Sequence, residues 1–191
     1  DKALAEADVI LVVGTPFDFR LGYGKSLNPA AKVIQIDQNY SVIGKNRDIE
    51  LGLLGHAGTI FRAVVDAVSG SEKRKMATKR KEWIATLRSA EAEALEKLMP
   101  LFKSENSLIN PYRVAYELNE FLEENTIYVG DGGDVVTISA QAVRPRRPGQ
   151  WMDPGPLGSL GVGTGFAIGA KLANPDKEVV CYYGDGAFSM T

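Results

Sequence analysis

The chain has 191 residues, 45% of them hydrophobic, and its 22 basic and 24 acidic side chains leave a formal net charge of −2. This balance argues against a nucleic-acid partner held on a basic face, and the single cysteine, Cys181, excludes an intrachain disulfide and a thiolate zinc cluster. No apolar run approaches the roughly 18 residues of a membrane helix and residues 1–8 lack the features of a signal peptide, so we expect a cytoplasmic protein without a membrane partner.

The first 70 residues are predicted to alternate helices and strands. A helix end, three strands and a second helix are expected in turn at residues 3–7, 9–13, 32–36, 49–54 and 57–68. Because the segment opens inside a helix, we interpret residues 1–70 as the C-terminal part of a Rossmann-like domain. Asp37 directly follows the second strand, which suits an acceptor for a ribose hydroxyl, as in dinucleotide-binding folds.

Residues 71–104 differ in character from the segment before them. Residues 71–80 are strongly basic, and residues 83–99 are rich in Ala, Leu and Glu with apolar side chains near one helical face. We interpret residues 71–104 as a helical linker that packs on a neighbouring domain. The basic stretch is either a solvated surface or a patch for an anionic ligand.

Residues 105–191 are predicted to form a second α/β unit. Asn110 and Pro111 suit the N-cap and first position of a helix. We expect a helix at residues 112–122, a strand at 126–129 and a short helix at 135–142. A glycine-rich segment that opens a helix follows at 157–172, and a last strand at 178–183. Strands separated by helices predict an α/β fold with two doubly wound parallel-sheet units, both incomplete in this chain.

Three glycine-rich loops of this second unit are expected to meet at one edge of its sheet, where open α/β folds bind ligands: residues 130–134, 154–161 and 184–189. Asp185 supplies a hard oxygen ligand for Mg²⁺, while Gly186 and Ala187 let phosphate oxygens approach the main chain at a helix start. A Gly-Asp-Gly sequence alone is equally compatible with a tight turn that carries a solvated aspartate.

Glycines also recur within the segment predicted to open a helix. Gly161, Gly165 and Gly169 are four residues apart and fall on one helical face. This spacing predicts close packing of that helix against a neighbour.

The order of these motifs resembles a known family. Gly158-Ser159-Leu160-Gly161, then an Ala- and Gly-rich helix, a strand and the segment 184–191, is similar to the cofactor-binding domain of thiamine diphosphate enzymes. The similarity is to the decarboxylase and carboligase branch, which includes acetolactate synthase, pyruvate oxidase, oxalyl-CoA decarboxylase and 2-hydroxyacyl-CoA lyase. It covers residues 105–191, and residues 1–69 resemble the central domain of the same enzymes through residues 7–14 and 35–37.

The resemblance implies a role for each position of the closing motif. Asp185 would bind Mg²⁺, which bridges to the diphosphate of thiamine diphosphate. Gly186 and Ala187 would donate main-chain N–H groups to that diphosphate, and Ser189 would add a hydroxyl.

The other two loops also receive roles from the resemblance. The Gly158 carbonyl would accept from the amino group of the aminopyrimidine, and Ser159 belongs to the same loop. The Leu160 N–H would donate to a ring nitrogen, and its side chain would separate the two rings as an apolar wedge. The first loop would contact the far end of the diphosphate through Asp131, Gly132, Gly133 and Asp134.

The resemblance further implies that the central domain of some members holds FAD, ADP or a CoA nucleotide, here near Gly14, Thr15 and Asp37; an empty site is the alternative. The second metal ligand and the glutamate that activates the aminopyrimidine are expected outside these 191 residues, the glutamate usually on a partner subunit. We therefore expect a fragment, inactive alone, of a homodimer or homotetramer with its active site at the subunit interface.

The implied activity is cleavage of a C–C bond next to a carbonyl. The first hypothesis is a lyase or decarboxylase of 2-hydroxyacyl-CoA or oxalyl-CoA-like substrates, and an acetolactate synthase-type carboligase acting on 2-oxo acids is its alternative. A hypothesis of another class is a regulatory module in which residues 1–69 hold an adenine nucleotide and the second unit is scaffold.

Overall fold

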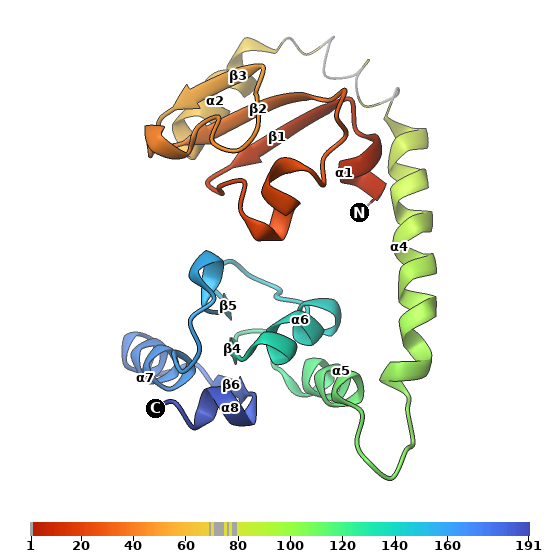
Figure 1. Cartoon of the computed structure of the whole chain (residues 1–191), viewed down its shortest axis with the longest axis vertical. Coiled ribbons are helices and arrows are strands. Elements are labelled where there is room, and N and C mark those ends of the chain that lie inside the picture. The colour runs from red at the N-terminus through yellow and green to blue at the C-terminus, as the bar shows by residue number, and fades with distance from the viewer. Residues whose placement is uncertain (1, 69, 71–74, 76, 78–79) are drawn as a thin grey trace. The chain divides into compact units, whose positions relative to one another are not determined.

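The computed structural model describes residues 2–68, 70, 75, 77 and 80–191 (Figure 1). The chain forms two compact units, Asp1–Ala94 and Leu95–Thr191, with the boundary inside the long helix α4 (Lys81–Phe102). Most of the basic stretch at residues 71–80 lies outside the described residues. Within the described ranges, no helix combines the length and the apolar character needed to cross a membrane.

The first unit is built on a three-stranded parallel sheet in the order β1-β2-β3. Its elements in chain order are α1 (Lys2–Glu6), β1 (Val9–Val13), η1 (Phe19–Gly24), β2 (Lys32–Asp37), η2 (Tyr40–Val42), β3 (Leu51–Leu54) and α2 (Ala57–Ala67). The predicted helices and strands are therefore present close to their expected limits. The two short 3₁₀ helices were not predicted, because single turns carry no apolar periodicity.

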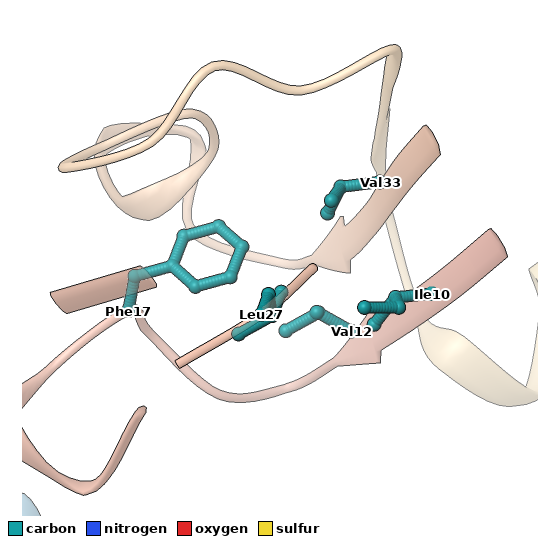
Figure 2. Packing of buried hydrophobic residues seen from close by; sticks show 5 residues of the cluster. All are labelled: Ile10, Val12, Phe17, Leu27 and Val33. Carbon is teal, nitrogen blue, oxygen red and sulfur yellow. The ribbon is translucent and has the colours of Figure 1, made fainter. Parts of the chain in front are cut away.

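One face of this sheet is covered by the chain that connects β1 to β2. Successive side chains of a strand point to opposite faces, so Ile10 and Val12 share a face with Val33 of the neighbouring strand. Phe17 and Leu27 of the connection close over them, as Figure 2 shows. This packing holds the start of the connection at the carboxyl end of β1.

The second unit contains a parallel sheet in the order β5-β4-β6. After α4, its elements are α5 (Pro111–Phe121), β4 (Ile127–Asp131), α6 (Gly133–Ala142), β5 (Trp151–Met152), η3 (Gly155–Leu157), α7 (Gly163–Ala173), β6 (Val179–Tyr183) and α8 (Asp185–Phe188). The two-residue strand β5 was missed, because it is too short to show a pattern of alternation.

β4 is the central strand, and all five of its residues are buried. Ile127 and Val129 pack with Ala170 of α7 on one face. Tyr128 packs on the opposite face with Leu122, which follows α5, and with Val143, which follows α6. Helices therefore cover both faces of a parallel sheet, which confirms the α/β class for this unit.

Two details of the predicted second unit are corrected by the structure. β4 continues to Asp131, so the first loop starts at Gly132, because residue 131 still pairs with Tyr183 of β6. The helix expected from residue 157 starts only at Gly163.

The predicted helical glycine face is wrong. Gly161 precedes α7 with φ of +83°, and a Cβ placed on Gly165 or Gly169 would meet no atom within 4 Å. The close approach instead occurs at Gly163, where the start of α7 meets the ends of β4 and β6.

The predicted N-cap of α5 is confirmed, because the Asn110 side chain accepts from the Tyr112 N–H at 2.9 Å. We expect Asn110→Ala to lower the free energy of unfolding by about 1 kcal/mol, since a first-turn N–H loses its acceptor. Asn110→Asp retains that acceptor and is expected to stay near the wild type. Chemical denaturation measures the difference, with Asn106→Ala in the exposed preceding loop as control; equal stability of the two alanine variants would contradict the cap.

Candidate cofactor site

The topology of the second unit marks one edge of its sheet as a binding site. The chain passes from β4 to β5 on one side, then crosses to β6 on the other side of β4. The strand order therefore reverses at β4, and open α/β sheets bind ligands at the carboxyl ends of the strands beside such a switch point. β4 and β6 end in register at this edge, with Asp131 opposite Tyr183.

The structure confirms that the three glycine-rich loops meet at this edge. The Gly184 N–H donates to the Asp131 carbonyl at 2.8 Å, which joins the first and third loops. Gly132 has φ of +116°, and a Cβ there would lie 3.1 Å from the Gly184 nitrogen, so the two backbones pass each other closely. The second loop approaches the residue directly after the third loop, because a Cβ on Gly161 would lie 2.9 Å from the Met190 Cβ.

Asp131 has no exposed surface, and its carboxylate is bound inside the protein. One oxygen accepts from the Gly161 N–H at 3.2 Å and the other from the Gly163 N–H at 2.7 Å. Gly132 is buried as well, whereas Gly133 and Asp134 are exposed at the first turn of α6. Of the four residues singled out in the first loop, these last two are therefore the exposed ones.

The turn after β6 presents one carboxylate and several N–H groups. Asp185 and Gly186 are exposed at the start of α8, and within the described part of the chain the Asp185 carboxylate has no hydrogen-bond or salt-bridge partner. The N–H groups of Gly186 and Ala187 precede the first intrahelical bond, which Phe188 donates to Gly184. An oxygen ligand beside unpaired donors suits a divalent cation with a diphosphate.

Two further observations bear on the fit of this turn. A Cβ on Gly186 would meet no atom of the protein within 4 Å, so the space beside its main chain is open. The Ser189 hydroxyl donates to the Gly186 carbonyl at 2.8 Å and keeps its acceptor capacity. Across the described residues, no three acidic, His or Cys side chains form a cluster, so a cation here would need other ligands besides Asp185.

The second loop is held at its entry and leaves Leu160 partly exposed. The Asp153 carboxylate accepts from the Trp151 indole N–H at 2.9 Å and from the Gly155 N–H at 2.7 Å. Gly158 ends the 3₁₀ turn in the left-handed region, with φ of +64°, which favours glycine. Leu160, two residues further along, is 41% exposed, so its side chain is available to a ligand.

Gly163, Thr164 and Tyr183 were not predicted as part of this edge. A Cβ on Gly163 would lie 2.8 Å from the Tyr183 ring and 2.9 Å from the Asp131 Cβ. The hydroxyls of Thr164 and Tyr183 are 2.9 Å apart, and burial raises the pKa of the Tyr183 phenol. No local signal distinguishes Gly163 from its neighbouring glycines, because its contacts come from strands distant in sequence.

We expect Gly163→Ala to destabilise the protein by about 1–3 kcal/mol, because the methyl group overlaps the ends of β4 and β6. Gly169→Ala in the same helix meets open space and is expected to stabilise by about 0.5–1 kcal/mol. Thermal unfolding of the two variants checks the pair. Equal effects would show that the close approach at Gly163 does not constrain the fold.

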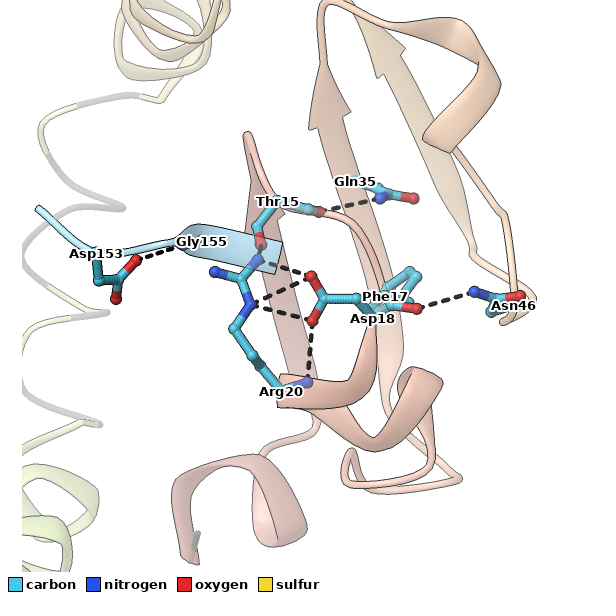
Figure 3. A network of polar contacts seen from close by, with 8 residues as sticks. All are labelled: Thr15, Phe17, Asp18, Arg20, Gln35, Asn46, Asp153 and Gly155. Atoms are coloured by element: carbon cyan, nitrogen blue, oxygen red, sulfur yellow. Dashed lines mark hydrogen bonds and ion pairs between the residues drawn. The ribbon is translucent and has the colours of Figure 1, made fainter. Parts of the chain in front are cut away.

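In the first unit, the residues singled out for a nucleotide lie at the carboxyl edge of β1 and β2. Gly14 has φ of +62° and donates to the Ile36 carbonyl at 2.9 Å. Asp37 accepts from the Asn39 N–H at 2.8 Å, which is a local turn and occupies one carboxylate oxygen. The side-chain amide of the buried Gln35 donates a hydrogen bond to the Thr15 carbonyl at 3.4 Å, which positions Thr15 near the same edge (Figure 3).

An ion pair orders the chain beyond Thr15. The Arg20 guanidinium contacts Asp18 at 2.8 Å and the Thr15 hydroxyl at 3.2 Å, as Figure 3 shows. Hydrogen bonding from Arg20 lowers the pKa of the Asp18 carboxyl below its ordinary value. Both side chains belong to the segment after β1 whose Phe17 fills the core, so core packing positions this polar group.

Two family models match successive parts of this chain. Residues 1–64 match the thiamine pyrophosphate enzyme central domain, and residues 131–191 match the thiamine pyrophosphate enzyme C-terminal TPP binding domain. The chain therefore belongs to the thiamine pyrophosphate enzymes, whose cofactor is the thiamine diphosphate named above. This confirms the resemblance carried by the glycine-rich loops.

Individual relatives are similar over nearly the whole chain. The human protein 2-hydroxyacyl-CoA lyase 2 is 39% identical over 198 residues, which cover 99% of this chain and 30% of that protein. The Danio rerio protein of the same name is 38% identical over 195 residues, with the same shares covered. Acetolactate synthase large subunit IlvG of Mycobacterium tuberculosis is 36% identical over 190 residues, covering 100% of this chain and 33% of that protein. The chain thus spans about a third of the length of these relatives.

Proposed function

We propose that the complete protein is a thiamine diphosphate-dependent C–C bond lyase or decarboxylase acting on 2-hydroxyacyl-CoA or oxalyl-CoA-like substrates. The observation that carries this proposal is the meeting of three glycine-rich loops at the β4 switch point, with Asp185 exposed beside unpaired N–H groups. Relatives named 2-hydroxyacyl-CoA lyase 2 support the choice of reaction.

In this proposal the turn after β6 holds the charged end of the cofactor. Asp185 binds Mg²⁺, Gly186 and Ala187 donate N–H groups to the diphosphate, and Ser189 accepts or donates through its hydroxyl. Gly133 and Asp134 lie at the far end of the diphosphate, at the first turn of α6. These groups anchor the cofactor without taking part in bond cleavage.

The second loop would hold the aminopyrimidine end. The Gly158 carbonyl and the Leu160 N–H bind its polar edge, Ser159 lines the loop, and the Leu160 side chain separates the two rings. When bound, thiamine diphosphate supplies a carbanion that attacks a carbonyl and stores the electrons of the broken bond. The chain contributes orientation and exclusion of water at this edge.

An acetolactate synthase-type carboligase acting on 2-oxo acids is the second candidate. It is favoured by the 36% identity to the Mycobacterium tuberculosis large subunit, which extends over the whole chain. Assay of the complete protein against pyruvate and a panel of 2-hydroxyacyl-CoA thioesters separates the candidates. Formyl-CoA release supports the lyase, and acetolactate without formyl-CoA would reverse the order.

The nucleotide and the assembly are also proposals. We infer that Gly14, Thr15 and Asp37 line a site for ADP, CoA or FAD, supported by their common position at one sheet edge. We also infer a homodimer or homotetramer with residues 71–104 as its interdomain linker. Two exposed apolar side chains next to the candidate site, Phe188 and Met190, suit an interface there.

The regulatory-module hypothesis predicts a different binding pattern. In that case ADP binds the complete protein, whereas thiamine diphosphate with Mg²⁺ produces no heat in a calorimetric titration. Saturable binding of thiamine diphosphate would reject a purely scaffolding second unit.

A further inference from the structure

We propose that Asp131 is a positioning residue that fixes the aminopyrimidine loop relative to the diphosphate turn, and that its carboxylate does not bind the diphosphate. This inference rests on the proposed function. It concerns how two parts of the site are held in register inside the second unit.

The side chain of Asp131 is a fully buried carboxylate. β4 is buried along its whole length, and Asp131 is the one carboxylate among the buried polar residues of the described chain. An ionised carboxylate without partners is strongly disfavoured in such a place. Here both oxygens are satisfied by main-chain donors, and the bond from the Gly163 N–H is short at 2.7 Å, as expected of a charge-assisted hydrogen bond.

The residue bonds to two loops through different groups. Its side chain accepts from Gly161 and Gly163, which close the loop that contains Leu160. Its main-chain carbonyl accepts from the Gly184 N–H, directly before Asp185. A side-chain substitution therefore releases the Leu160 loop but retains the bond that holds the diphosphate turn.

Steric contacts make this junction rigid. Gly163 lies so close to the Asp131 and Tyr183 side chains that a Cβ would come within 3 Å of each. Asn at position 131 has the same size but one acceptor oxygen, so its NH₂ group would face a main-chain N–H. Loss of one bond and donor–donor repulsion would loosen the loop, which must then be ordered when the cofactor binds.

Binding of two different ligands to the complete protein distinguishes an effect on the Leu160 loop from an effect on the diphosphate turn. Calorimetry measures the affinity for each ligand in the presence of Mg²⁺. Binding of thiamine diphosphate needs both the Leu160 loop and the diphosphate turn, whereas binding of inorganic pyrophosphate needs the turn alone. We expect Asp131→Asn to weaken thiamine diphosphate binding roughly tenfold or more and to change pyrophosphate binding by less than about twofold. Equal losses would indicate direct contact with the diphosphate, and unchanged affinities would also overturn the proposal.

A second variant covers the case in which Asp131→Asn does not fold. Gly158→Ala disturbs the same loop without altering the carboxylate or touching the diphosphate turn, because Gly158 has φ of +64° and its Cβ would meet no atom within 4 Å. This variant is expected to lose affinity for thiamine diphosphate but not for pyrophosphate. Equal effects on the two affinities would contradict the role of the loop. Asp176→Asn, an exposed residue before β6, is the matched control.

A readout without cofactor separates this inference from the proposed function. In the apoprotein, the Gly161 and Gly163 amides are expected to exchange with solvent more slowly than the Ser159 amide, and Asp131→Asn should accelerate them about tenfold or more. If the wild type bound no thiamine diphosphate, the proposed function would fail while this test remained decisive. Rapid exchange of both amides in the wild type would refute the positioning role.

Discussion

Asp185→Ala is expected to weaken Mg²⁺-dependent binding of thiamine diphosphate by more than about a hundredfold, because the carboxylate is the side-chain metal ligand proposed for this chain. The side chain is exposed and has no protein partner within the described residues, so stability should change by less than about 0.5 kcal/mol. Calorimetric titration of the complete protein, with thermal unfolding in parallel, measures both quantities.

The matched control for this result is Asp176→Ala. Asp176 is also exposed but precedes β6, at the opposite end of the strand from Asp185. Its removal should leave cofactor affinity unchanged. Wild-type cofactor affinity in Asp185→Ala would contradict the assignment of Asp185 as a metal ligand. Similar losses of affinity in both variants would indicate a general effect of charge.

Leu160→Ala is expected to reduce cofactor affinity and turnover roughly tenfold to a hundredfold, because a side chain that would be buried between two rings loses about 2 kcal/mol of apolar contact. Since 41% of Leu160 is exposed in this chain, the variant should fold normally. Thiamine diphosphate titration and steady-state turnover of the complete protein provide the measurement.

Leu157→Ala tests whether that effect is specific to position 160. Leu157 lies in the same loop and is 89% exposed, and it receives no role in cofactor binding. Its replacement should change neither affinity nor turnover. Full activity of Leu160→Ala would remove this side chain from the proposed mechanism.

The local elements of both units could be predicted from sequence, because their signals are local. β1 and β6 are continuous apolar runs, Asn110 and Pro111 mark a helix start, and Asp185 stands between two glycines after a strand. The resemblance that identified the cofactor depends on the same short motifs. Their expected convergence at one edge followed from the direction of parallel strands alone.

Other features were decided by contacts between distant residues. The sequence suggests that Asp131 is an accessible loop carboxylate, yet pairing with β6 extends β4 to include this residue. Its two carboxylate oxygens accept from Gly161, just before α7, and from Gly163, the first residue of α7. Likewise, helical spacing suggested packing at Gly165 and Gly169, whereas Gly163 makes the close approach.

The amino-acid sequence by itself determined the α/β class, the loops that carry the chemistry and the family, since these depend on periodicity and short motifs. Only the tertiary structure decided that Asp131 faces inward and that Asp185 and Leu160 remain accessible. The physical reason is that burial and hydrogen-bond partners arise from segments about 30 residues or more apart, whose positions no local pattern encodes.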